Sequence, residues 1–226
     1  MKALVIAIDG PAGSGKSTVA RALAQRLGYH YLDTGAMYRA AASKLDRLGV
    51  PVEEGDRLRD AMRAIRIDLE GEAHPLRVLV DGEDVTTEIR TPRIAMLASR
   101  YSVLATVRDG LTELQRSWKR RGGVVAEGRD TTTVVFPDAD FKVYLDATPG
   151  ERARRCLGDL RAQGLEADAA RIREEIEARD RADSTRALAP LARASDAIYI
   201  DTTGLPVEDV VERLVREAKR LCCIES

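Results

Sequence analysis

The 226-residue sequence contains no asparagine. It therefore has no Asn-Lys-x-Asp motif, with which guanine-specific GTPases bind their base, and it lacks the asparagine that binds Mg²⁺ in protein-kinase catalytic loops. Histidine is nearly as scarce, because only two are present and neither lies in a motif. These absences argue against a GTPase and against a protein kinase.

Cysteine and long apolar runs are also scarce. The three cysteines, Cys156, Cys222 and Cys223, have no ligand spacing, and adjacent cysteines are poor disulfide partners. We therefore expect reduced thiols and a cytoplasmic protein. No apolar run approaches the ~20 residues of a membrane span. The first apolar segment runs straight into a glycine loop and does not resemble a signal peptide.

Charge is almost balanced along the chain. Lys and Arg total 36 against 37 Asp and Glu, for a net charge of −1. A general affinity for nucleic acid or for an anionic membrane is therefore not expected, and any positive potential must be local. Most of the basic residues are arginines, which favour bidentate contacts to phosphate or carboxylate groups.

Five short apolar segments predict the strands of one sheet. The segments between them carry apolar residues at helical spacing, for instance Val19, Leu23 and Leu27. This rhythm predicts a parallel sheet with right-handed crossovers, and so an α/β, three-layer fold with a central five-stranded parallel sheet. The predicted strands are residues 4–8, 29–32, 124–127, 141–146 and 198–201. The predicted helices are residues 16–27, 34–48, 94–120 and 207–218.

The rhythm changes in two places. Residues 66–90 contain two short strand-like segments, with turns at Gly71 and at Asp81-Gly82, which predicts a small antiparallel insertion. Residues 150–186 are strongly charged and helical in pattern, with an interruption at Gly164. One domain with these two excursions is the expected organisation.

Residues 10–17, Gly-Pro-Ala-Gly-Ser-Gly-Lys-Ser, fit the phosphate-binding pattern G-x4-G-K-[S/T] between a predicted strand and a predicted helix. Glycines allow backbone N–H groups to surround phosphate oxygens, and the helix adds the positive end of its dipole. Lys16 would place its charge on the β- and γ-phosphates, and Ser17 is the predicted Mg²⁺ ligand. The predicted ATP-binding residues of this P-loop are Gly10, Pro11, Ala12, Gly13, Ser14, Gly15, Lys16, Ser17 and Thr18.

The sequence offers no obvious general base, which suits a phosphate acceptor. The second ionisation of a phosphate monoester lies at about pH 6, so its oxygen is already charged at pH 7. Such a reaction needs positive charge around two anions, and arginine is abundant in the second half of the chain. Arg179, Asp183 and Arg186 have the spacing of one helix face. Arg129 and Asp130 follow a strand's carboxyl end, where open α/β sheets bind ligands.

With the P-loop, six further segments resemble the bacterial cytidylate kinase family, in order and over nearly the whole chain. Each segment alone is a weak signal, but six in order after a P-loop are highly specific. They are Asp33-Thr-Gly-Ala-Met-Tyr-Arg39, Gly82-Glu-Asp-Val-Thr, Glu88-Ile-Arg-Thr, Glu127-Gly-Arg-Asp130, Val134-Val-Phe-Pro-Asp138 and Arg186-Ala-Leu-Ala-Pro-Leu191.

The resemblance implies a monomeric P-loop nucleoside monophosphate kinase that phosphorylates CMP and dCMP from ATP with Mg²⁺. It implies a kinase core at residues 1–65 and 91–226, with an ATP lid at residues 149–168, and a monophosphate-binding insertion at residues 66–90. The implied catalytic residues are Lys16, Arg129, Arg179 and Asp130, and the implied lid contact to ATP is Arg155. The implied substrate-binding residues are Thr34, Arg39, Ser99, Arg108, Arg129, Asp130, Arg179, Asp183 and Arg186.

Three of these residues would read the base. Asp130 is the implied partner of the cytosine amine, and Arg108 and Ser99 are the implied donors to the ring acceptors. Uracil would turn an acceptor toward the carboxylate, at a cost of about 1–3 kcal/mol. Ser99 and Arg108 are nine residues apart, hence on opposite faces of a straight helix. If both reach the base, the predicted helix must break near residues 103–106.

Alternatives stay open for the function and for several residues. The chain could be a P-loop kinase acting on UMP or on another small acceptor, or an ATP-binding module without phosphoryl transfer. Arg179 and Asp183 have the spacing of an ordinary solvated ion pair. Asp9 either caps a strand end or hydrogen-bonds the phosphate machinery or Mg²⁺ waters. Arg152, Arg154 and Arg155 could form a solvated helix face, or they could be lid residues that contact the phosphates of ATP.

The chain departs from the family pattern at several positions. Cys156 and Asp159 occupy lid positions where an arginine and a glutamine are expected, which leaves open the arginine that covers the transferring phosphoryl group. Thr131-Thr132 replaces an apolar residue and a glycine, and so would add bulk beside the base pocket. Ala182 stands where the family often has an arginine.

Overall fold

The computed structural model describes residues 3–71, 76–162, 164 and 168–224. Its centre is a sheet with strand order β2-β6-β1-β7-β8, in which all four neighbouring pairs run parallel. Because the strands are parallel, their carboxyl ends meet at one edge, where α/β sheets bind ligands. The strands are β1 (Val5–Asp9), β2 (His30–Asp33), β6 (Val124–Gly128), β7 (Phe141–Asp146) and β8 (Ile198–Asp201).

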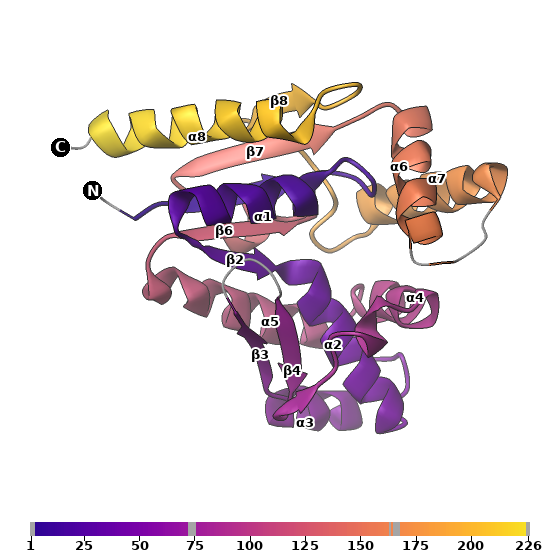
Figure 1. The fold of residues 1–226 in the computed structure, drawn as a ribbon. Coiled ribbons are helices and arrows are strands. Elements are labelled where there is room, and N and C mark those ends of the chain that lie inside the picture. Colours follow the sequence, from indigo (N-terminus) through magenta and orange to yellow (C-terminus); the bar gives the residue numbers. More distant parts are fainter. Residues whose placement is uncertain (1–2, 72–75, 163, 165–167, 225–226) are drawn as a thin grey trace.

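The central strand is buried along its whole length. Every residue of β1 is buried, which explains why its sequence is a continuous apolar run from Val5 to Ile8 and not an alternating one. Helices α1 (Lys16–Leu27) and α8 (Val207–Ile224) run side by side along the sheet and contact each other (Figure 1). Gly28 ends α1 in a left-handed conformation and donates its N–H back to the last turn.

A second group of elements lies below the sheet in Figure 1, around α2. Helix α2 contacts α4 and the small sheet, whose order is β3-β4-β5 with antiparallel pairing. Alternate residues of β3 are buried, so one face of this sheet packs inward and the other faces solvent. The elements are α2 (Thr34–Arg47), α3 (Asp56–Ala64), β3 (Ile67–Glu70), β4 (Arg77–Val80), β5 (Glu83–Asp84), the short turn η1 (Glu88–Arg90) and α4 (Pro92–Tyr101).

Helices α6 (Pro149–Ala162) and α7 (Ala169–Thr185) form a third group at the carboxyl ends of the strands (Figure 1). They pack on each other around Ala153, Ile172 and Ile176, a small apolar cluster that is separate from the main core. The pair therefore has a core of its own beside the sheet. Residues 163 and 165–167 of the predicted lid lie outside the described residues.

The predicted fold class is confirmed: the chain is α/β, with a central five-stranded parallel sheet and a small antiparallel sheet. The predicted single helix over residues 94–120 is wrong, because α4 ends at Tyr101, α5 (Ala105–Ser117) follows, and η2 (Trp118–Arg121) completes the segment. The gap at residues 102–104 confirms the expected break. Helix α3 and the five-residue π-type turn η3 (Thr131–Val135) were not predicted.

Across the described ranges, no helix is both long enough and apolar enough to cross a bilayer.

Candidate active site

The loop between β1 and α1 fits closely against neighbouring backbone. A Cβ on Gly10 would lie 2.0 Å from the carbonyl oxygen of Leu145, and a Cβ on Gly13 would lie 2.8 Å from that of Arg152. Gly13 also has a φ of +75°, which disfavours other residues. The chain therefore turns tightly into α1, whose first N–H groups have no partner within the helix and attract anions.

Lys16 points into this loop. Its side chain is buried, and Nζ donates a hydrogen bond to the carbonyl oxygen of Pro11 at 3.0 Å. Burial, followed by the positive charge of Arg129, lowers the pKa of Lys16 to about 7. A bound anion would offset both effects, so a phosphate would stabilise the charged form of Lys16.

Ser17 faces a buried carboxylate. Its Oγ donates to Oε1 of Glu127 at 2.7 Å, and the hydroxyl of Tyr31 lies 3.4 Å from the same oxygen. Burial, and then the charge of Asp33, raise the pKa of Glu127. Sequence reasoning gave Glu127 no role, although its place at the end of β6, beside β1, is a detectable signal.

The Ser17–Glu127 pair fits a Mg²⁺ ion that arrives with its nucleotide. Mg²⁺ prefers hard oxygen ligands and is commonly held by one or two protein groups, with phosphates and waters completing the shell. Within the described ranges, no cluster of three or more His, Cys, Asp or Glu side chains could hold a metal by itself. Ser17 and Glu127 would thus be two protein groups beside an ion whose other ligands are phosphate oxygens and waters.

Asp183 of α7 gathers three arginines. Nε of Arg129 donates to Oδ2 of Asp183 at 2.8 Å, Nε of Arg179 lies 4.0 Å from the same oxygen, and Nη1 of Arg186 lies 3.9 Å from Oδ1. The carboxylate of Asp183 therefore interacts with three arginines. The ion pair of Arg179 with Asp183 is part of this network and is not an isolated surface pair.

This network is short of negative charge. The charge of Arg129, more than burial, lowers the pKa of Arg179 to about 10. Burial contributes less to the lowered pKa, because 46% of the Arg179 side chain is exposed to solvent. Two arginines that repel each other beside Lys16 form a strong attractor for a polyanion.

Residues at the start of α2 contribute a second acidic and basic pair. Asp33 caps α2 by accepting from the N–H of Ala36 at 2.7 Å, and it pairs with Arg39 at 3.3 Å. The Thr34 hydroxyl donates to the carbonyl oxygen of Glu127 at 2.7 Å and is buried. Both contacts fix the end of α2 next to the phosphate loop.

The break between α4 and α5 brings the predicted base-reading residues near one another. Ser102 Oγ donates to the carbonyl oxygen of Ser99 at 2.8 Å, and Arg108 Nη1 donates to that of Ser102 at 3.0 Å. Arg108 also forms a buried ion pair with Oδ2 of Asp130, while Arg186 lies 3.4 Å from Oδ1. Both carboxylate oxygens of Asp130 are therefore held by arginines.

The three arginines of α6 have different surroundings. Arg152 is buried and donates to the carbonyl oxygens of Ala147 at 3.0 Å and Ala12 at 3.2 Å, so it is not part of a solvated face. Arg154 is exposed and pairs with Glu151. Arg155 donates to Oγ1 and to the carbonyl oxygen of Thr202, at 2.9 and 2.7 Å.

The structure shows the partners of Asp9 and corrects the expectation for Thr131 and Thr132. The carboxylate of Asp9 accepts hydrogen bonds from both threonines, and its negative charge opposes the lowering of the Lys16 pKa. Both threonines are buried, with 1% of each residue exposed to solvent, and neither lines the cavity. They therefore add no bulk beside the base pocket.

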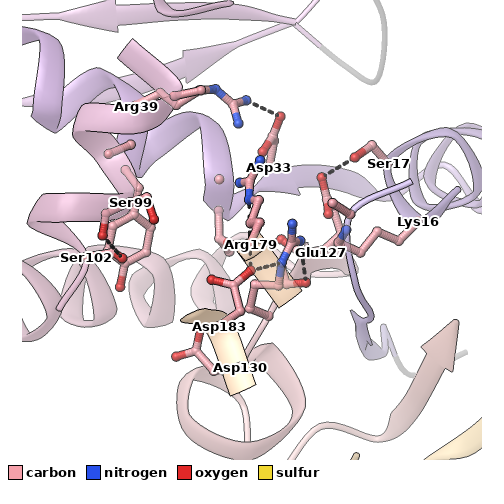
Figure 2. A pocket seen from close by; sticks show the side chains of 18 of the residues that line it. Lys16, Ser17, Asp33, Arg39, Ser99, Ser102, Glu127, Asp130, Arg179 and Asp183 are labelled. Carbon is pink, nitrogen blue, oxygen red and sulfur yellow. Dashed lines mark hydrogen bonds and ion pairs between the residues drawn. The ribbon is translucent and has the colours of Figure 1, made fainter. Parts of the chain in front are cut away.

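One cavity of about 300 Å³ joins these groups. Figure 2 shows Lys16 and Ser17 on one side of it, Ser99 and Ser102 on the other, and Arg179 between them. Arg108 and Arg155 do not line it, and of the P-loop only residues 12, 13, 16 and 17 do. The other predicted substrate residues all line it: Thr34, Arg39, Ser99, Arg129, Asp130, Arg179, Asp183 and Arg186. The lining residues that sequence reasoning missed include Asp33, Tyr38, Ser102, Glu127 and Cys156.

The sequence was compared with the profiles of known protein families. The cytidylate kinase family profile matches residues 6–220. The chain belongs to the cytidylate kinase family. As a member it is a nucleoside monophosphate kinase, and hence a transferase.

Relatives of the family match along nearly the full chain. The cytidylate kinase of Symbiobacterium thermophilum is 49% identical over 218 residues, which is 96% of each chain. That of Pelotomaculum thermopropionicum is 50% identical over 211 residues, or 93% of each chain. The bifunctional pantoate ligase/cytidylate kinase of Synechococcus elongatus is 48% identical over 94% of this chain and 41% of its own length.

A solved structure also resembles this fold. An uncharacterized protein from Eubacterium ventriosum superposes with a TM-score of 0.55 at 13% identity, covering 97% of this chain and 99% of its own. At that identity the likeness concerns the fold alone.

Replacing Lys16 by methionine is expected to stabilise the nucleotide-free protein at neutral pH while abolishing phosphoryl transfer. The folded pKa of Lys16, about 7, lies below the ordinary value of 10.5, so its charge opposes folding. Below pH 7, Lys16 is charged in both the folded and the unfolded chain, and the destabilisation by its buried charge is largest. Above pH 7, only the unfolded chain keeps the proton on Lys16, so this destabilisation falls by about 1.4 kcal/mol per pH unit.

Urea unfolding of the wild type and of Lys16→Met between about pH 6.5 and 9.5 measures this effect. The stability advantage of the variant should narrow as the pH rises. Lys119→Met, at a half-exposed lysine, should show no such trend. An advantage for Lys16→Met that stays constant with pH would contradict the assignment.

Proposed function

We propose that this kinase transfers the γ-phosphoryl group of ATP directly to CMP and dCMP, forming CDP and dCDP. The observation that carries the proposal is the single cavity in which Lys16 of the phosphate loop meets Arg129, Arg179 and Asp183. The family membership supports it, as do the cytidylate kinase names of the relatives. The enzyme is proposed to act as a cytoplasmic monomer.

The donor side of the cavity would hold ATP. Lys16 and the first N–H groups of α1 face the β- and γ-phosphates, with the P-loop residues Gly10 to Thr18 around them and Arg155 at the rim. Ser17 and Glu127 would hold Mg²⁺, which neutralises charge on the phosphates when it is bound. The carboxylate of Glu127 gains from such a cation, because burial disfavours its charge in the free protein.

The acceptor side would hold the monophosphate. Arg39, Arg129 and Arg186 are proposed to bind its phosphate, and Arg179 with Asp183 its ribose. The acceptor oxygen attacks the γ-phosphorus while the bond to the bridging oxygen of ADP breaks. No general base is needed, because that oxygen is already ionised at neutral pH. Lys16, Arg129 and Arg179 then stabilise the charge that is spread over the transferring group.

The base would be read by Asp130 and Ser99, and Arg108, which does not line the cavity, would act through Asp130. Arg108 reaches Asp130 from behind the cavity and fixes its carboxylate, which can then accept from the cytosine amine. Uracil presents a carbonyl oxygen at that position and leaves the carboxylate facing an acceptor. A loss of about 1–3 kcal/mol, or roughly tenfold to a hundredfold in selectivity, is expected.

Water has to be excluded during the transfer. We propose that residues 149–168 act as a lid and residues 66–90 as a monophosphate-binding insertion on the core of residues 1–65 and 91–226. Helix α6 of this lid packs on α7 around a small apolar core that is separate from the main core, so we expect α6 to move together with α7. Cys156 lines the cavity from this side, where the family resemblance led us to expect an arginine.

An ADP-release assay with Mg²⁺ and ATP across all nucleoside monophosphates tests the function. CMP and dCMP should each elicit ADP release, and UMP much less. Asp130→Ala, and the similarly shaped Asp130→Asn, should lose most of the preference for CMP over UMP, by tenfold or more. Absence of CMP-dependent release would end the proposal. Activity on UMP or another small acceptor that ignores Asp130 would favour the alternative kinase.

Glu127→Gln tests the proposed Mg²⁺ position. The amide keeps the shape and the contact with Ser17 but removes the negative charge, so kcat should fall about 10- to 100-fold and more Mg²⁺ should be needed for half-saturation. The KM for CMP should change little. The measurement is a Mg²⁺ titration at saturating nucleotides.

Tyr31→Phe is the matched control for that titration, because it removes the hydroxyl 3.4 Å from the same carboxylate and keeps the charge. Its Mg²⁺ dependence should equal that of the wild type. An unchanged Mg²⁺ dependence in Glu127→Gln would show that Glu127 does not serve the metal.

A further inference from the structure

A buried cluster behind the cavity connects the donor loop to the base-reading segment. Asp9 is the last residue of β1, immediately before the phosphate loop, and it is fully buried. Its carboxylate accepts from the N–H groups of Thr131 at 2.9 Å and Thr132 at 2.7 Å. It also accepts from both threonine hydroxyls. None of the three residues lines the cavity, so any effect on the substrate must pass through a neighbour.

That neighbour is Asp130, which directly precedes the threonines. The carbonyl oxygen of Asp130 accepts from the N–H groups of Val134 at 2.9 Å and Val135 at 3.1 Å, which ties it into η3. Arg116 of α5 holds the other end of this turn by donating to the carbonyl oxygens of the same two valines. The turn is thus anchored to α5 at one end and to Asp9 at the other.

The four hydrogen bonds to Asp9 satisfy a carboxylate that is fully buried. Burial disfavours the charge of Asp9 and raises its pKa, while the four donors oppose that shift. Hydrogen bonds to a charged group are roughly twice as strong as neutral ones. Loss of one donor at a buried carboxylate therefore forces the turn or the carboxylate to move.

We propose that Asp9, Thr131 and Thr132 form a positioning clamp that holds Asp130 at a set place relative to the P-loop and thereby controls selection of cytosine over uracil. The inference rests on the proposed function and extends it to residues that touch no substrate.

The chain supplies a matched control one residue further along. Thr133 lies in the same turn, but its Oγ1 is buried without a hydrogen-bond partner among the described residues. Thr132→Val and Thr133→Val therefore make the same chemical change in the same turn. Only the first removes a donor from Asp9.

The test measures kcat/KM for CMP and for UMP, together with KM for ATP, in Thr132→Val, Thr132→Ser and Thr133→Val. Thr132→Val should lower the CMP-to-UMP selectivity about 5- to 10-fold, mainly through a higher KM for CMP, with KM for ATP within about twofold of the wild type. Thr132→Ser keeps the hydroxyl and should restore the selectivity. Thr133→Val should match the wild type.

Equal selectivity in Thr132→Val and Thr133→Val would overturn the clamp. A loss of activity toward both acceptors without a change in their ratio would do the same. If Thr132→Val does not fold, Thr132→Ala and Thr133→Ala repeat the comparison without adding a methyl group beside the carboxylate. A wild-type enzyme without CMP-dependent ADP release would instead refute the proposed function, so the two failures are distinguishable.

Discussion

Repulsion between cations is the constraint on which this active site depends. Two nucleotides that meet phosphate to phosphate need several positive groups within one small cavity, and those groups repel one another before the anions arrive. The positive charge of Arg129 is the main cause of the lowered pKa of Arg179, and it adds to the larger effect of burial in lowering the pKa of Lys16. The fold has to hold the cations together without neutralising them.

Buried carboxylates perform that task. Asp183 gathers the arginines of the acceptor side, Asp130 is held between Arg108 and Arg186, and Glu127 lies beside Ser17 at the donor side. Glu127 lies in β6 and Asp130 follows the carboxyl end of that strand, whereas Asp183 belongs to α7. The parallel sheet therefore places two of these groups at one edge, and the ion pair of Arg129 with Asp183 joins α7 to that edge.

Much of the fold could be predicted because its signals are local. The strands at residues 141–146 and 198–201 match the predicted bounds, since short apolar runs between polar turns leave few other options. Helix α3 was missed because it is mostly charged and buries only Leu58. Sequence spacing also predicted the break between α4 and α5, but only once a shared ligand was assumed.

The sequence predicted many of the residues that form the site, but it did not predict which of them contact one another. Arg129, Asp130 and Asp183 were found from motifs, yet the contact between Arg129 and Asp183 joins residues 54 positions apart. The hydrogen bond that Thr132 donates to Asp9 spans 123 positions, and only the folded sheet reveals it. Glu127 was overlooked although it stands at the end of a predicted strand, because its contact with Ser17 depends on β6 lying next to β1.

The central claim is that donor and acceptor phosphates share one cleft. Calorimetric titration with adenosine and cytidine joined through a 5′–5′ pentaphosphate tests it most directly. The account predicts one molecule bound per chain, about 100-fold or more tighter than ATP, with both ATP and CMP excluded. An affinity no greater than that of ATP, with CMP still binding to the complex, would contradict it.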